Sequence, residues 1–378
     1  MAQPQLLRAL NMQAVLASIT ERGPLSRADI ARLTGLSRVT VSATVQALIG
    51  QGFVREREAI HTPLGKRAVP VELVPDVHYV LAGWANGDSL WVGSMDVAGT
   101  PVRRVQRRGV SSDADLTREL PGAVSEALSG VPLDRVLGLG LAIAGIVDPV
   151  RGVVVSSRPL GYQRARLAPR LTDLLGGLSV TLENGVNATL LGDYLERGGA
   201  DRKASVVMLT FRHGVGGAIM LHGKLYRGQA NMAGEVSELV TMGRTGTPLR
   251  LEDAVGEPGL VRRLKEVRPD IGGVEEALMA AEADRALRAV LEDAGERLAM
   301  AVVNLCLLLA PDTVVMTGPP WIQRVYYEPV RSAVSQGVPI AVGVRVLEDP
   351  LSAVLRGAAA VQMAAHPLAK SLLASASV

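Results

Sequence analysis

Between residues 37 and 46, hydroxyl-bearing side chains and one arginine are interspersed with apolar residues. Hydroxyl, amide and guanidinium groups can form hydrogen bonds with the base edges and phosphates of nucleic acid. The residues with this chemistry are Ser37, Arg38, Thr40, Ser42 and Thr44, and Ala43 and Gln46 share their side of the segment. We expect Arg38, Thr40 and Thr44 to make the main DNA contacts.

Two short helices joined by a turn must position these side chains. In residues 26–50, SRADIARLTGLSRVTVSATVQALIG, apolar residues recur at helical spacing on both sides of Gly35. Gly35 can adopt the left-handed conformation that ends a helix, and Ser26 and Ser37 stand where N-caps would begin the two helices. The apolar positions are Ile30, Leu33, Leu36, Val41, Val45, Leu48 and Ile49. The pattern is typical of a helix-turn-helix, whose second helix enters the major groove of DNA.

A predicted strand-loop-strand over residues 53–74 follows the two helices. Its loop carries His61, Gly65, Lys66 and Arg67. Such a wing can place basic side chains such as Lys66 and Arg67 on the DNA backbone or in the minor groove. Residues 1–72 contain nine Lys and Arg against five Asp and Glu, a net charge of +4, whereas the whole chain carries +3. The sequence therefore predicts a winged helix-turn-helix domain over residues 1–75.

Composition limits the class of protein. With 378 residues, 48% hydrophobic and 20% charged, the chain is expected to be a soluble globular protein of two or three domains. Its single cysteine, Cys306, excludes a disulfide framework and is expected to be a buried core residue. The chain opens without a secretory leader and lacks an apolar run long enough for a bilayer, which predicts a cytoplasmic protein without membrane insertion. An aromatic content of 3% argues against base-stacking RNA binders.

From about residue 76, glycine-punctuated strands alternate with helices, as in an α/β domain with mixed sheets. The first half is predicted to contain a hairpin of residues 79–83 and 90–96, strands over 102–107 and 136–143, and helices over 116–128 and 171–175. The second half is predicted to contain strands over 205–210, 218–221 and 313–317 and a long helix over 286–309. Two similar halves predict two lobes around a cleft.

Four segments of this larger domain resemble the ROK family of sugar kinases and sugar-responsive repressors. They are residues 137–194, GVGGAIMLHGKLYRGQANMAGEVSEL at 214–239, PDTVVMTG at 311–318 and GAAAVQM at 357–363. The resemblance implies a two-lobed actin-like (ribonuclease H-like) fold over residues 76–378, with an effector site for a sugar in the cleft and a role in oligomerisation. The winged helix before it matches the family's repressor branch, including the xylose- and N-acetylglucosamine-type repressors.

Departures from the kinase pattern predict that the chain is not an enzyme. In the kinases, the last residue of an END segment is the aspartate that serves as base on the sugar hydroxyl, and here that position is Gly185, which cannot accept a proton. Ala85 replaces an aspartate of the first phosphate segment, and the nearby Asp88 is expected to be a hairpin-turn residue. Arg212 and His213 begin the segment where the family has a glycine-rich phosphate loop, and they could bind an anion such as a sugar phosphate. We expect no nucleotide or other cofactor.

The structural zinc site of the family is also expected to be absent. Glu238 replaces a histidine, and residues 242–251 contain no cysteine, so the tetrahedral ligand set is missing. Positions that contact sugar hydroxyls in the family are retained as Asn184, Glu235 and Glu252, with Glu238 in place of a histidine of the same role. Carboxylates and amides suit paired hydroxyls. Alternatively, Glu235 and Glu238 lie one helical turn apart and could both face water.

These residues predict a transcription factor, expected to be a repressor of carbohydrate-related genes. It would bind a palindromic operator in double-stranded DNA as a homodimer or homotetramer and respond to a sugar or sugar-phosphate effector. Two alternatives remain open. The chain could be a sugar kinase with an accessory DNA-binding head, or a ligand-blind scaffold whose ROK lobes only dimerise or dock another protein.

Overall fold

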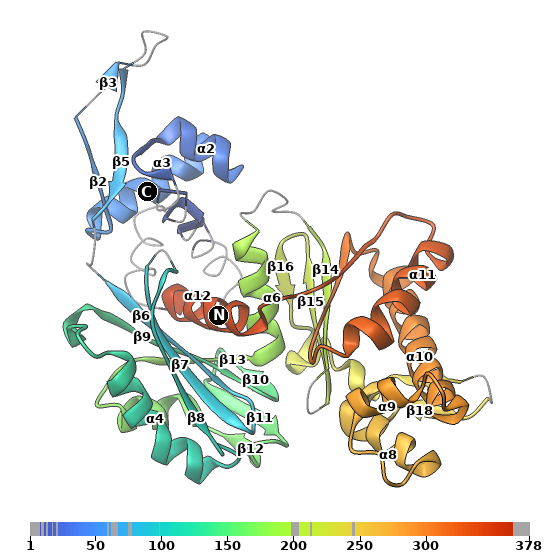
Figure 1. The fold of residues 1–378 in the computed structure, drawn as a ribbon. Coiled ribbons are helices and arrows are strands. Elements are labelled where there is room, and N and C mark those ends of the chain that lie inside the picture. The colour runs from blue at the N-terminus through green and yellow to red at the C-terminus, as the bar shows by residue number, and fades with distance from the viewer. Residues whose placement is uncertain are drawn as a thin grey trace. The chain divides into compact units, whose positions relative to one another are not determined.

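The computed structural model describes residues 8, 11–12, 14–16, 18–19, 22–58, 60–61, 67–74, 78–97, 99–197, 204–211, 214–243 and 246–365. They fall into two compact units, Met1–Arg202 with Leu351–Val378, and Lys203–Pro350. Each unit contains a five-stranded sheet that mixes parallel and antiparallel strands, as the sequence predicts (Figure 1).

The predicted winged helix opens the first unit. Helices α2 (Arg27–Thr34) and α3 (Arg38–Gly50) pack through Ile30, Val41 and Val45, which are fully buried. Strand β1 before these helices and two strands after them form an antiparallel sheet in the order β1-β5-β2. Its strands are β1 (Leu25–Ser26), β2 (Val54–Glu56) and β5 (Pro70–Leu73), and the shorter pair β3 (Ile60–His61) and β4 (Arg67–Ala68) lies between β2 and β5 in the chain.

A mixed sheet in the order β13-β9-β6-β7-β8 forms the centre of the first unit. Strands β6, β7 and β8 form antiparallel pairs, whereas β9 runs parallel to both β6 and β13. The strands are β6 (Tyr79–Ala85), β7 (Ser89–Asp96), β8 (Pro101–Arg108), β9 (Val136–Ile143) and β13 (Val180–Asn184). A second sheet, which the sequence analysis missed, contains β10 (Ile146–Asp148), β11 (Val153–Ser157) and β12 (Tyr162–Ala165). The helices are α4 (Asp113–Ala127), α5 (Leu167–Leu174), α6 (Gly185–Glu196) and the short η1 (Leu133–Arg135).

Helix α12 (Pro350–Ala365) returns from the second unit to close the first (Figure 1). The backbone of α12 packs directly against the backbone of β9 and α6. A Cβ atom at Gly140 of β9 would lie 1.9 Å from Ala358 O, and one at Gly192 of α6 would lie 1.8 Å from Ala353 O. The fully buried Gln362 amide adds hydrogen bonds to β9 and β13. One apolar cluster combines residues of α12 with residues of the sheet and of the winged helix.

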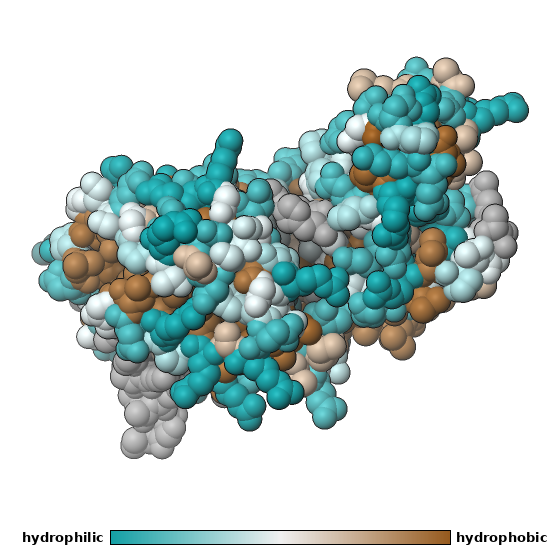
Figure 2. Space-filling view, turned by 90° about the horizontal axis from the view of Figure 1, so that it is seen from below, coloured by the Kyte–Doolittle hydropathy of each residue, from teal (hydrophilic) through white to brown (hydrophobic). Residues whose placement is uncertain are grey.

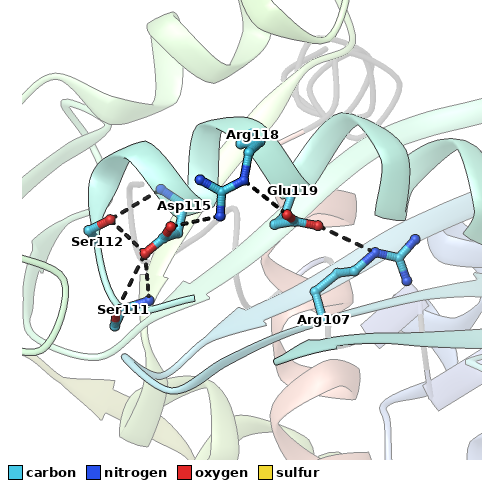
Figure 3. Close-up of polar contacts among 6 residues, drawn as sticks. All are labelled: Arg107, Ser111, Ser112, Asp115, Arg118 and Glu119. Carbon is cyan, nitrogen blue, oxygen red and sulfur yellow. Dashed lines mark hydrogen bonds and ion pairs between the residues drawn. The ribbon is translucent and has the colours of Figure 1, made fainter. Parts of the chain in front are cut away.

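A capping network at the start of α4 ties this helix to the sheet (Figure 3). Ser112 Oγ accepts from Asp115 N at 3.2 Å and donates to Asp115 Oδ2 at 2.7 Å. Arg118 bridges Asp115 (2.7 Å) and Glu119 (3.1 Å), and Glu119 faces Arg107 of β8 at 3.7 Å. The hydrogen bond from Ser112, followed by that from Arg118, lowers the pKa of Asp115 to about 2.

The second unit contains a sheet in the order β16-β15-β14-β19-β20. Strand β14 is parallel to β19 and antiparallel to β15. The strands are β14 (Val206–Phe211), β15 (Val215–Leu221), β16 (Lys224–Tyr226), β19 (Thr313–Thr317) and β20 (Gly343–Val346), with the separate pair β17 (Val240–Met242) and β18 (Pro248–Arg250). The helices are η2 (Gln229–Asn231), η3 (Val236–Glu238), α7 (Leu251–Val255), α8 (Glu257–Val267), α9 (Val274–Ala280), α10 (Arg285–Leu309), the π-helical η4 (Gln323–Tyr327) and α11 (Glu328–Gly337).

The long helix predicted over residues 286–309 is α10, and it runs through the core of the second unit. Cys306 on this helix is buried as expected, and burial raises the pKa of its thiol to about 11. Within the part of the chain that the structure describes, no helix is both long and apolar enough to cross a bilayer. On the face drawn in Figure 2, hydrophobic side chains form several separate patches among hydrophilic ones.

Candidate functional site

The local structure around α3 confirms the predicted caps and turn. Ser26 Oγ accepts from Asp29 N at 3.2 Å, and Ser37 Oγ accepts from Thr40 N at 3.1 Å. Gly35 ends α2 in the left-handed region, with φ at 66°. Because the cap side chain satisfies one backbone amide of each first turn, each helix can begin at a fixed residue.

The exposed face of α3 differs in part from the predicted set. Arg38 and Ser42 are exposed, as are Ala43 and Gln46. Thr40 and Thr44 are half-buried. Thr40 Oγ1 lies 2.8 Å from Ser37 Oγ, so the two hydroxyls form a hydrogen bond at the N-cap of α3. Val39 is not among the predicted contacts, yet its side chain is 80% exposed between Arg38 and Thr40.

The wing carries arginines that the sequence analysis did not consider. Arg55 and Arg57 extend from the β2 side of the wing and lie 2.6 Å and 2.5 Å from the carboxylate of Glu72 on β5. The hydrogen bond from Arg55, followed by that from Arg57, holds the pKa of Glu72 below its usual range against the opposing effect of burial. Arg67 begins β4, paired with His61, whereas Lys66 lies outside the described residues.

In the first unit, Asn184 ends β13 and caps α6. Its Oδ1 accepts from Val186 N (2.8 Å) and Asn187 N (3.0 Å), and its Nδ2 donates to Gly145 O (2.7 Å). The amide thus fixes the start of α6 and retains one N–H for a ligand. At the neighbouring Gly185, a Cβ atom would lie 3.3 Å from the indole nitrogen of Trp84.

The β6–β7 turn of the first unit follows the residue that the kinase resemblance predicts to replace a phosphate-segment aspartate. Ala85 ends β6 and is fully buried. Asn86 Oδ1 accepts from Asp88 N (3.0 Å) and Ser89 N (2.8 Å), which confirms Asp88 as a hairpin-turn residue. The predicted anion ligands Arg212 and His213 lie outside the described residues.

All three predicted sugar-contacting carboxylates belong to the second unit. Glu235 precedes η3 and is half-buried, and its burial, followed by the charges of Glu238 and Glu252, raises the pKa of its carboxyl. Glu252 Oε2 accepts from Val215 N at 2.9 Å at the start of β15. Glu238 is exposed and pairs with Arg250 at 3.3 Å. Of the three, Glu235 is the one whose carboxyl has a raised pKa, a feature that is common among binding and catalytic carboxylates.

A buried arginine organises the loop between β17 and β18, where the family's zinc cysteines would be expected. Arg297 of α10 is 3% exposed, and its Nη1 donates to Thr241 O and Thr247 O, each at 3.1 Å. Its Nε donates to Asp293 Oδ2 at 2.7 Å, and Asp293 also pairs with Arg263.

This loop does not fit a zinc ion. Its centre holds the guanidinium of Arg297, so close that a Cβ atom at Gly243 would lie 2.1 Å from Nη2. Among the described residues, no group of three or more His, Cys, Asp or Glu side chains could hold a metal ion.

Two parts of the chain match models of known protein families. Residues 99–370 match the model of the ROK family, and residues 13–62 match that of the MarR family. The xylose repressor of Caldicellulosiruptor bescii is 24% identical over 367 residues, which cover 89% of this chain and 90% of that protein.

Solved structures show the same fold. A ROK family transcriptional regulator, a homolog of the E. coli MLC protein, covers 98% of both chains with a TM-score of 0.73 and 19% identity. A ROK family glucokinase from Streptomyces griseus, in complex with glucose and AMPPNP, covers 74% of this chain and 98% of its own, with a TM-score of 0.61 and 21% identity. The chain therefore belongs to the ROK family and carries a MarR-type winged helix-turn-helix at its N-terminal side.

Proposed function

We propose that the chain is a DNA-binding transcriptional regulator of the repressor type that controls carbohydrate-related genes. The observation that carries this proposal is α3, a capped helix with an exposed face, held on a winged helix ahead of a ROK domain. The likeness to a protein named as a xylose repressor supports the same reading. The DNA-binding domain would comprise residues 1–75, and residues 76–378 would bind the effector and form the oligomer.

The effector would be a sugar or a sugar derivative. Asn184, Glu235, Glu238 and Glu252 are its proposed contacts, and Glu235 is the central one because it is half-buried among other acids. A half-buried carboxylate can accept hydrogen bonds from sugar hydroxyl groups in place of those from water.

The repressor is proposed to lack kinase activity. Gly185 cannot act as a base, and Ala85 cannot hold a phosphate or a metal. The kinase alternative predicts release of ADP that depends on sugar and is lost in the Glu235→Ala variant. Equal ADP release by the wild type and this variant, at the level seen without sugar, would exclude it.

Regulation would follow from linkage between the two sites. An effector that binds more tightly to the DNA-free state must weaken DNA binding by the same coupling free energy. A homodimer or homotetramer is expected, because one short helix reads few base pairs while a two-fold axis matched to a palindrome doubles the contacts.

The proposal is tested by capturing genomic fragments with the purified full chain at two salt concentrations. Recovery of a palindromic site near transport or sugar-metabolism genes is expected, and those genes would nominate the effector. Uniform recovery that depends only on salt would contradict specific recognition, since phosphate contacts alone behave in this way.

The hydrogen bonds that already occupy Asn184 and the ion pair of Glu238 favour a second candidate, a ligand-blind scaffold. A panel of sugars and sugar phosphates separates the two, because a ligand specific for the folded state raises the midpoint of thermal unfolding. A shift that disappears in Glu235→Gln supports an effector site, whereas no shift across the panel supports the scaffold.

A further inference from the structure

The exposed face of α3 includes an apolar stripe. Val39, at 80%, has the largest exposed fraction among the large hydrophobic side chains of the described residues. Its apolar neighbours on the helix, Val41 and Val45, are fully buried, so Val39 takes no part in the core. Ala43 lies one turn further along and is also exposed, with Ser42 beside it. Residues 39 and 43 therefore share one side of the helix, away from the protein.

The place of this stripe indicates what it touches. It begins in the first turn of α3, and the N-terminal residues of a recognition helix are those that reach base edges in the major groove. The apolar group displayed in that groove is the C5-methyl of thymine. Arg38 and Gln46, which flank the stripe and are exposed, supply the groups that pair with guanine and adenine edges respectively.

We propose that Val39 and Ala43 read thymine methyl groups in the operator, which makes Val39 a specificity-determining residue. This inference rests on the proposed function. Four residues of helix advance about 6 Å along its axis, which corresponds to about two base-pair steps of about 3.4 Å. The half-site therefore contains a thymine opposite Val39 and a second one within about two base pairs of it.

The test uses the full chain and a binding site selected from random duplex DNA. Each thymine of the half-site is replaced in turn by deoxyuridine, which removes only the methyl group, and the Kd is measured for the wild type and for Val39→Ala. Val150→Ala is the matched control, because Val150 is 72% exposed in the turn between β10 and β11. Val39→Ala is expected to fold, since the position is exposed and alanine favours helices more than valine does.

Uridine at one or two of the thymine positions should raise the wild-type Kd about fourfold each, which is the effect expected from losing one buried methyl-sized group. Val39→Ala should weaken binding to the thymine site by a similar factor and then lose its response to uridine opposite position 39, while Val150→Ala behaves like the wild type. Two results would overturn methyl readout without contradicting the proposed regulator. In the first, uridine substitution does not change the wild-type Kd; in the second, it changes the Kd of Val39→Ala as much as that of the wild type. If no binding site can be selected, both specific DNA binding and methyl readout by Val39 and Ala43 would be refuted.

Discussion

Replacing Arg297 by methionine is expected to lower the free energy of unfolding of the second unit by about 3 kcal/mol. Removing one partner of a buried ion pair costs about 3–5 kcal/mol, because the remaining groups stay desolvated and unpaired. Arg297 is 3% exposed, and its loss leaves the carbonyls of Thr241 and Thr247 without this donor. Asp293 keeps its pair with Arg263, which places the expected loss at the lower end of that range.

Tryptophan fluorescence can follow the second unit alone. The chain has three tryptophans, of which Trp321 is buried in the core of the second unit while Trp84 and Trp91 belong to β6 and β7 of the first. With Trp84 and Trp91 replaced by phenylalanine, urea unfolding gives the stability of the region around Trp321. The matched control is Glu292→Gln, an exposed position on the same helix, which should stay within about 0.5 kcal/mol of the parent.

A loss below about 1 kcal/mol for Arg297→Met, the level of a single surface interaction, would refute a stabilising role of Arg297 in the β17–β18 loop. Gly243→Ala gives an independent check, because its Cβ atom would lie 2.1 Å from Arg297 Nη2 and 2.5 Å from Asp293 Oδ1. The double variant should lose less than the sum of the two single losses, since both changes disrupt the same contacts. If the two losses in unfolding free energy were fully additive, Gly243 and Arg297 would stabilise the unit independently of each other.

Ser37→Ala should destabilise the winged helix by about 1 kcal/mol through loss of the α3 N-cap; thermal unfolding of the full chain would show it, and an unchanged midpoint would argue against the cap. Asp115 has a pKa lowered to about 2, so its contribution to stability is present above the unfolded value near 3.8 and is lost as pH falls toward 2. Asp115→Asn should flatten stability in that interval, and an identical pH profile would contradict the network in Figure 3. The raised pKa of Glu235 has the opposite effect, because this half-buried carboxylate destabilises the fold increasingly as pH rises from the unfolded value near 4.5 through the higher pKa of the folded state. Glu235→Gln should therefore gain more stability at pH 7 than at pH 4 while losing the thermal shift given by sugar, and equal changes at both pH values would count against a desolvated carboxylate.

Local rules predicted the winged helix and several strands. Ser26, Ser37 and Gly35 cap their helices as expected, because capping depends on residues within one turn. The predicted strands over residues 136–143 and 313–317 coincide with β9 and β19, since both are rich in apolar residues and contain no charged one. The predicted strand over 218–221 begins at Val215 in β15, because Gly216 and Gly217 give no strand signal of their own and are paired by β14.

Other features depend on partners that are distant in the sequence. Arg297 contacts Thr241 and Thr247, which lie 56 and 50 residues away in the sequence. The only local signal for Arg297 is its spacing of four from Asp293 on the same helix. The residue type of Thr40 favours a DNA contact, yet its hydroxyl faces Ser37. This contact depends on the rotamers of both side chains, which the sequence does not specify. Val39 was overlooked because an apolar residue in a helical run is usually assigned to the core.

The return of α12 to the first unit determines the order in which the protein can be completed on the ribosome. Strands β9 and β13 leave the exit tunnel long before Gln362 and Ala358, which they contact, have been synthesised. At typical elongation rates of about 5–20 residues per second, the intervening unit delays α12 by on the order of ten seconds. We therefore expect the unit that carries the DNA-binding head to finish folding last, after the unit Lys203–Pro350, which is continuous in the chain.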